Sequence, residues 1–73
     1  MKNYNDRIRE LREDNDLTQK QIAEVLGIDQ RVYSNYEIGY RALPIEHLIT
    51  LCKYYNVSAD WILGLDGEKS KRD

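Results

Sequence analysis

Residues 17–39, Leu-Thr-Gln-Lys-Gln-Ile-Ala-Glu-Val-Leu-Gly-Ile-Asp-Gln-Arg-Val-Tyr-Ser-Asn-Tyr-Glu-Ile-Gly, carry the pattern of two short amphipathic helices joined by a tight turn. Thr18 followed three residues later by Gln21 is the signature of a capping box, so a first helix is predicted to begin at Thr18. Its apolar residues then recur at the spacing that lines one face of a helix: Ile22, Ala23 and Leu26.

The turn and the second helix follow directly from this point. Gly27 lies where a residue with positive φ closes a helix, and Ile28 returns the chain to the core. Asp29 is a good N-cap, and Gly39 ends the segment. The second helix turns its tyrosines inward and leaves a polar face outward, comprising Gln30, Arg31, Val32, Ser34 and Asn35. Two helices arranged in this way form a helix-turn-helix, whose second helix can enter the DNA major groove.

One helix before this motif and one after it are predicted. Residues 4–15 place Tyr4, Ile8 and Leu11 on one helical stripe. Residues 44–55 begin with Pro44, which suits the first turn of a helix. The apolar face expected for this helix is Ile45, Leu48, Ile49, Cys52 and Tyr55, widened by Leu51.

The C-terminal part of the chain is predicted to hold one more short helix. Ser58 is its N-cap, and it carries Trp61, Ile62 and Leu65. Residues 66–73 are charged and without periodicity, so they are predicted to form a polar tail. The fold class is therefore all-α, a compact bundle of five short helices in one domain over residues 1–65, with no repeats and no β signal.

The length and composition of the chain limit the classes of function that it can have. A chain of 73 residues with 41% hydrophobic and 33% charged residues makes one small globular domain, too small for a large enzyme cleft. It has no apolar run of membrane-spanning length, no signal-peptide pattern and a single cysteine, Cys52. We therefore expect a cytoplasmic protein that does not enter a membrane.

The formal net charge of -2 is unusual for a nucleic-acid-binding domain, but local charge matters more. Between residues 18 and 41 three cations balance three acids: Lys20, Arg31 and Arg41 against Glu24, Asp29 and Glu37. If Glu37 is buried and paired, the exposed face of this segment is mildly positive. We expect modest affinity for DNA and a shallow salt dependence.

The order and spacing of these features resemble the Xre family of helix-turn-helix proteins, which includes phage repressors and Cro proteins. The resemblance covers residues 5–65. It rests on the Leu-Thr-Gln start at residues 17–19, on Ala23 and Gly27, on Tyr-Glu-Ile-Gly at residues 36–39, and on Val-Ser-Ala-Asp-Trp at residues 57–61. It implies a lambda-repressor-like DNA-binding domain that acts as a sequence-specific transcriptional regulator, by default a repressor, with a recognition helix at residues 29–38.

The resemblance also implies a structural ion pair between Arg12 and Glu37, which would join the first and third helices. A pair at that junction would hold the recognition helix at a fixed angle, and removal of one partner would leave a charge unpaired at a cost of about 3–5 kcal/mol. The alternative is that both side chains are solvated surface charges.

The residues that would contact DNA follow from the same resemblance, and each has suitable chemistry. Gln30 can pair with adenine, Arg31 with guanine, and Val32 can touch a thymine methyl group. Ser34 and Asn35 lie one turn further along. The backbone contacts implied are Thr18, Gln19, Lys20, Tyr40 and Arg41. The alternative is that this is an ordinary solvated helix face, since such residues are common on surfaces.

The sequence argues against an enzyme active site and against a metal site. Cys52 and His47 would be the nucleophile and the base, but five residues on one helix place them about 140° apart around its axis. One His and one Cys do not complete a closed tetrahedral metal shell. We expect no enzyme activity, no metal and no cofactor.

The serious competitor is a protein-interaction module of the same fold, such as an antitoxin that binds a toxin, with DNA binding secondary. The acidic balance of the chain favours this competitor. We also expect a weak homodimer that reads a palindromic operator of two half-sites. Its interface is predicted at Leu43, Ile45, Trp61, Ile62 and Leu65, unless Trp61 and Ile62 simply seal the core.

Overall fold

The computed structural model describes residues 3–65, which contain five α-helices and no strand. Their bounds are Tyr4–Asp14 for α1, Gln19–Leu26 for α2, Gln30–Glu37 for α3, Ile45–Tyr55 for α4 and Ala59–Leu63 for α5. The predicted bundle of five short helices is thus confirmed. Within the described part, no helix has the length and apolarity needed to cross a membrane. The tail predicted for residues 66–73 lies outside the described residues.

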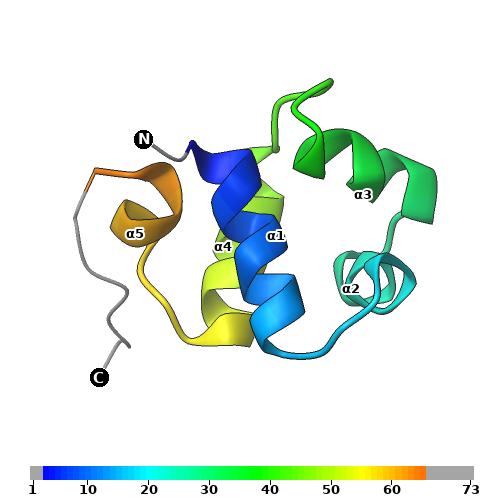
Figure 1. Ribbon diagram of the computed structural model, residues 1–73, viewed down its shortest axis with the longest axis horizontal. Helices are drawn as coiled ribbons and strands as arrows, with labels where there is room; N and C mark the ends of the chain where they lie inside the picture. The colour runs from blue at the N-terminus through cyan, green and yellow to red at the C-terminus, as the bar shows by residue number, and fades with distance from the viewer. Residues whose placement is uncertain (1–2, 66–73) are drawn as a thin grey trace.

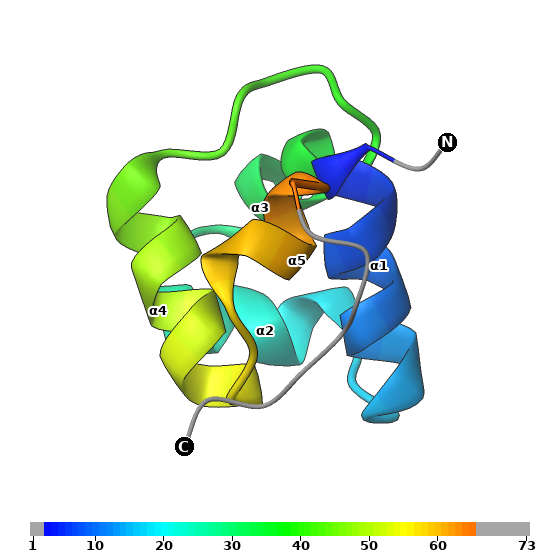
Figure 2. The ribbon, with the colours of Figure 1, turned by 90° about the vertical axis from the view of Figure 1, so that its left-hand side faces the viewer.

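Two helices form the centre of the bundle, and the other three lie on either side of them. Figure 1 shows α1 and α4 in the middle, α2 and α3 on one side, and α5 on the other. In Figure 2 the connector of residues 38–44 arches over the top of the bundle from α3 to α4. This layout leaves the outer face of α3 at one side of the molecule.

Local hydrogen bonds build the two helices of the motif. The Thr18 hydroxyl accepts from the Gln21 backbone N–H at 3.1 Å, and the Gln21 side chain accepts from the Thr18 N–H at 2.8 Å. Gly27 closes α2 in the left-handed region at φ 71°. Asp29 caps α3 by accepting from the Arg31 N–H at 2.8 Å. The capping box, the glycine turn and the second N-cap therefore stand where the sequence predicts them.

The core settles the role of the α5 side chains. Trp61 is 5% exposed and Ile62 is fully buried, so neither forms the predicted dimer surface; both seal the core. The physical reason is that α5 packs against α1, where the Arg7 guanidinium stacks 4.6 Å from the centre of the Trp61 ring. Leu43 is half-buried and packs against the core, so only part of its side chain is open to a partner.

The apolar face of α4 differs from the predicted one. Leu48, Leu51 and Cys52 face the core, whereas Ile45 is 73% exposed and Ile49 50% exposed. The stripe of apolar residues is wider than the surface that neighbouring helices cover. Leu51 at one edge of the stripe is fully buried, so the covered surface is shifted toward Leu51 and away from Ile45 and Ile49. Leu65 lies beyond the end of α5 and is also exposed. Burial raises the pKa of Tyr55, so its hydroxyl stays neutral within the bundle.

An ion pair joins α1 to α3. Arg12 Nε lies 2.7 Å from Glu37 Oε2, and Arg12 Nη2 lies 3.1 Å from Glu37 Oε1, so the contact is bidentate. A third Arg12 nitrogen, Nη1, donates to the Leu17 carbonyl at 2.9 Å and so holds the segment that leads into α2. The two helices of the motif are therefore both anchored to α1 through one guanidinium.

The Glu37 carboxylate is buried, with 4% of the residue exposed, yet it remains ionised. Burial by itself would raise its pKa, but the hydrogen bonds from Arg12 and Gln19 outweigh that effect and hold the pKa below its ordinary value of 4.5. The same pair raises the pKa of Arg12. The two charges therefore stabilise each other inside the bundle.

We predict that Glu37→Gln lowers the free energy of unfolding at pH 7 by about 3 kcal/mol, because it leaves the Arg12 charge without its partner. The folded-state pKa of Glu37 is depressed, so the stabilisation is complete above pH 4.5 and is lost as the pH falls through the folded-state pKa. Urea unfolding from pH 7 to pH 2 should therefore show the two proteins converging in acid.

The matched control is Glu24→Gln, which makes the same change at an exposed position of α2. It should change the free energy of unfolding by less than about 0.5 kcal/mol at any pH. A constant difference between the parent and Glu37→Gln across the acid range would contradict this account of the pair.

Candidate nucleic-acid interface

The outer face of α3 is polar because its inner face is fixed by three buried residues. Tyr33, Tyr36 and Glu37 point into the bundle, and burial raises the pKa of Tyr33. The side chains opposite to them form the outer face, in which Gln30, Arg31 and Val32 are exposed and Ser34 and Asn35 are half-buried. The helix itself spans Gln30–Glu37, so Asp29 and Ile38 of the predicted range are its caps.

Three of the predicted base-reading residues share one recess. A hollow of about 450 Å³ is lined by Gln30, Arg31 and Ser34 of α3, together with Gln19 of α2 and the cap residue Asp29. Val32 and Asn35 do not line it, and they lie at other angles around the α3 axis. The structure thus brings the start of α2 to the first turn of α3.

Gln19 has a role that the sequence did not indicate. Its Nε2 donates to Glu37 Oε1 at 3.1 Å, which ties the first turn of α2 to the last turn of α3. One amide hydrogen is used in this contact, so the side chain is held in place at the edge of the recess. No local sequence pattern marks this contact, because Glu37 lies 18 positions further along the chain.

The other residues of the predicted backbone set differ in how they are held. The Thr18 hydroxyl is engaged in the α2 cap, and the Lys20 side chain is exposed beside it. Tyr40 and Arg41 are exposed on the connector. The first N–H groups of α2, which lack helical partners and carry the positive end of the helix dipole, favour an anion near Gln19.

The end of α3 shapes the connector. The Tyr40 N–H donates to the Asn35 carbonyl at 2.9 Å, and the Gly39 N–H donates to the Tyr36 carbonyl at 3.3 Å. These two bonds form a Schellman motif, in which Gly39 adopts φ 83°. The Arg41 N–H also reaches the Asn35 carbonyl, at 3.2 Å, so the chain folds back beside the last turn of α3.

Burial of Glu37 changes the charge of this surface. With Glu37 paired to Arg12, the ionised residues left exposed between positions 18 and 41 are three cations and two acids, Lys20, Arg31, Arg41, Glu24 and Asp29. The exposed part of the segment therefore carries one net positive charge, in agreement with the mildly positive face predicted from the sequence for a buried Glu37.

Two contacts from the first turn of α1 reach the same region and were not anticipated. Asn5 Nδ2 donates to the Glu37 carbonyl at 3.2 Å, and the Tyr4 hydroxyl accepts from the Leu43 N–H at 3.2 Å. Asn5 lies seven positions before Arg12, which places both on one face of α1. That spacing was the signal that could have found it.

The face as a whole offers amides and a guanidinium at the start of a helix, flanked by N–H groups and cations. Side-chain amides donate and accept in pairs, and guanidinium donates in pairs, so these groups match the edges of bases in the major groove. The flanking groups match phosphate oxygens. This arrangement suits a DNA duplex.

Comparison with known proteins agrees with the geometry. The model of the family described as Helix-turn-helix matches residues 8–62. The chain is 43% identical over 67 residues to the HTH-type transcriptional regulator ImmR of Bacillus subtilis (strain 168), covering 92% of this chain and 52% of ImmR. It is 37% identical over 59 residues to the antitoxin PezA of Streptococcus pneumoniae serotype 4, covering 81% of this chain and 37% of PezA.

The fold is also present in a solved structure. The crystal structure of a transcriptional regulator from Listeria innocua matches with a TM-score of 0.81 and 28% identity, covering 96% of this chain and 64% of that one. The chain spans about half the length of the curated relatives it matches. With the family model matching most of the chain and the same five-helix fold, the protein belongs to the Xre/Cro-type helix-turn-helix family.

Proposed function

We propose that this chain binds double-stranded DNA in a sequence-specific manner as a transcriptional repressor, with α3 in the major groove. The observation that carries the proposal is the recess at the first turn of α3, where Gln19, Gln30, Arg31 and Ser34 converge on an outward face. Repression by occupying a promoter is the mechanism that such a domain supports.

Base reading is assigned to the outer face of α3. Gln30 contacts the N6 and N7 atoms of an adenine, and Arg31 contacts the O6 and N7 atoms of a guanine. Val32, Ser34 and Asn35 complete the face. Support comes from the exposure of the first-turn residues and from the Arg12–Glu37 pair, which fixes the angle of α3.

Backbone contacts are assigned to both sides of that helix. Gln19 uses its second amide hydrogen for a phosphate, with Thr18 and Lys20 beside it. Tyr40 and Arg41 hold a flanking phosphate from the connector. Lys20 and Arg41 are the two cations assigned to phosphates, so they predict a shallow salt dependence, with a slope of log affinity against log salt of about -1.8 per chain.

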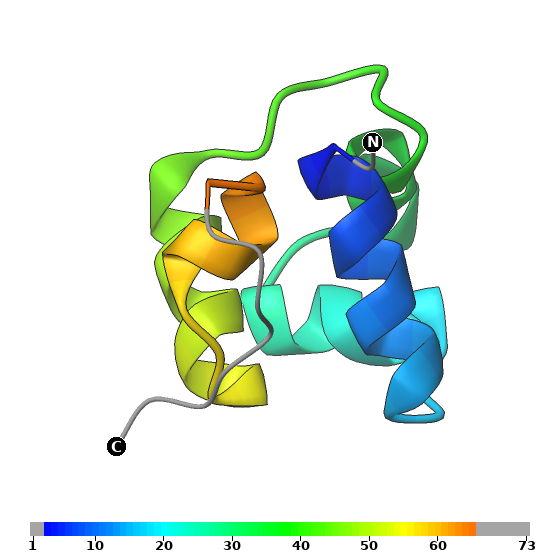
Figure 3. The same ribbon diagram turned by 60° about the vertical axis from the view of Figure 1, so that its left-hand side comes forward.

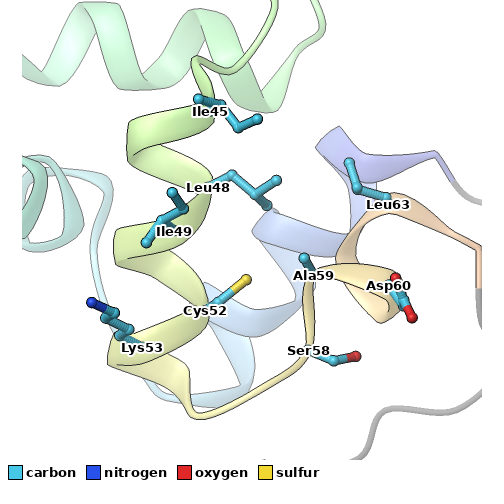
Figure 4. Close-up of a pocket in the computed structure, with 9 residues that line it drawn as sticks. All are labelled: Ile45, Leu48, Ile49, Cys52, Lys53, Ser58, Ala59, Asp60 and Leu63. Atoms are coloured by element: carbon cyan, nitrogen blue, oxygen red, sulfur yellow. The ribbon is translucent and has the colours of Figure 1, made fainter.

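We infer that two copies bind a palindromic operator through a groove between α4 and α5. The groove has a volume of about 570 Å³, and its apolar lining includes Ile45, Ile49 and Leu63 (Figure 4). Lys53 and Asp60 lie at opposite sides of it. A two-fold interface is self-complementary, so Lys53 of each copy would face Asp60 of the other. Of the residues predicted for the dimer interface, Ile45 and the exposed Leu65 remain part of this proposal.

A second candidate function is protein binding as an antitoxin. The likeness to PezA and the net charge of -2 favour it. In this case a protein partner would occupy an exposed face, and DNA affinity would be weak at every salt concentration. In vitro selection from random duplexes separates the two, because a repressor enriches a palindromic sequence and a dedicated protein-binding module enriches none.

We predict that Arg31→Ala weakens binding to the selected duplex by about 1–3 kcal/mol and relaxes specificity at one base position. Gln30→Ala should relax specificity at a neighbouring position, because a bidentate contact is lost. Mobility shifts of the parent and each variant on the selected duplex and its single-base substitutions, over a range of salt concentrations, measure both effects.

The control is Arg9→Ala, which removes the same charge from an exposed position of α1. It should leave the base preferences unchanged. If Gln30→Ala and Arg31→Ala bind the selected duplex as well as the parent at every salt concentration, base reading by α3 is wrong.

The dimer inference makes a separate prediction. Lys53→Glu and Asp60→Lys should each shift the operator complex from two chains toward one, because like charges then face each other across the two-fold axis. The double variant that carries both substitutions should restore the complex of two chains, because the two charges have only exchanged places and opposite charges again face each other. Sedimentation velocity on a full operator measures this, and a parent that remains a monomer both alone and on that operator would remove the idea.

A further inference from the structure

The last turn of α3 leaves one backbone carbonyl that a distant side chain satisfies. The Schellman bonds use the carbonyls of Asn35 and Tyr36, and Ile38 donates to Ser34. The Glu37 carbonyl has no partner within the helix, as is usual at a C-terminus. Asn5 Nδ2 donates to it at 3.2 Å from the first turn of α1. Asn5 therefore caps the recognition helix from outside.

The shape of the connector is matched to this cap. A Cβ atom at position 39 would lie 3.3 Å from Asn5 Nδ2, and the φ of +83° at Gly39 is one that other residues rarely adopt. Glycine thus permits both the sharp turn and the close approach of the Asn5 amide. The start of the connector and the start of α1 fit against each other.

The other end of the connector is held by the residue next to Asn5. The Tyr4 hydroxyl accepts from the Leu43 backbone N–H at 3.2 Å, across 39 positions of sequence. Figures 2 and 3 show the first turn of α1 beside the α3 end of the connector, which then runs across to α4. Two adjacent side chains of α1 therefore hold the connector near both of its ends.

Between these two anchors lie Tyr40 and Arg41, whose side chains are exposed. We propose that the first turn of α1 positions the DNA-backbone contacts of the connector, with Asn5 and Tyr4 as the positioning residues that fix Tyr40 and Arg41 relative to α3. This role rests on the proposed DNA-binding function. Asn5 and Tyr4 themselves need not touch DNA.

The arrangement follows from how α1 meets α3. Arg12 holds the Glu37 side chain, and Asn5, about two helical turns earlier, holds the Glu37 backbone. One residue of the recognition helix is therefore gripped at two points along α1, and the connector begins at the second point. A phosphate contact on a short connector gains from such preorganisation, because less freedom is lost on binding.

The test compares Asn5→Ala with a matched control. Asn15→Ala also removes an asparagine amide that donates to a helix carbonyl, that of Leu11 at 2.8 Å, but at the opposite end of α1. The Tyr4→Phe variant removes only the acceptor for the Leu43 N–H and keeps the ring. Circular dichroism establishes that each variant is folded, and if Asn5→Ala does not fold, Tyr4→Phe carries the same measurements.

The first measurement is made without DNA. Hydrogen exchange of the Tyr40 and Arg41 amides, both bonded to the Asn35 carbonyl, should be faster in Asn5→Ala by about 2- to 12-fold, the equivalent of one hydrogen bond. Asn15→Ala should leave these two amides at the parent rate. Unchanged exchange of both amides in Asn5→Ala and Tyr4→Phe would overturn the proposal, whatever the chain binds.

The second measurement asks whether Asn5 acts through Arg41. On the selected duplex, Arg41→Ala should weaken binding and reduce the salt slope by about 0.9. Asn5→Ala should weaken binding less in the Arg41→Ala background than in the parent, because one of the two contacts that it positions is already gone. Equal effects of Asn5→Ala in both backgrounds would refute the positioning role. If in vitro selection enriches no duplex, the DNA-binding part of both proposals is wrong. The hydrogen-exchange result then still tests whether Asn5 and Tyr4 hold the connector.

Discussion

One buried carboxylate holds this small bundle in its working shape. Glu37 receives two hydrogen bonds from Arg12 on α1 and one from Gln19 on α2, and its backbone carbonyl receives one from Asn5. A carboxylate with 4% exposure is costly to leave unpaired, so the fold is stable only where these donors meet it. The angle of α3 is therefore set by electrostatics as well as by packing.

The same interaction shapes the surface that meets the solvent. Because Glu37 is paired internally, the exposed part of the motif keeps a net positive charge in a chain whose total is -2. A modest charge supplies little nonspecific affinity for DNA, so in the proposed function the discrimination between sequences depends on a few side chains held in register. Rigidity of α3 and of its connector matters more here than it would in a strongly basic domain.

The two faces proposed for binding lie on different helices. Figure 1 shows α3 and α5 on opposite sides of the central pair formed by α1 and α4. The groove beside α5 is therefore separate from the outer face of α3, and a second copy seated there leaves α3 open to DNA. In the proposed dimer, the two recognition helices would read the two half-sites of the palindromic operator. The scaffold helices would thus link the proposed base reading to the proposed pairing of two copies.

Local sequence by itself determined the elements: the Thr18–Gln21 capping box, the left-handed Gly27 and the Asp29 cap depend on neighbours within a few residues, so their patterns are readable in the chain. Only the tertiary structure decided which apolar residues of α4 and α5 are covered, because the predicted stripe was wider than the contact surface. It also decided the roles of Gln19 and Asn5, whose partners lie 18 and 32 positions away. Hydrogen bonds across such distances depend on how helices are placed. Helical periodicity puts Asn5 on the same face of α1 as Arg12, but it does not say which part of the chain that face meets.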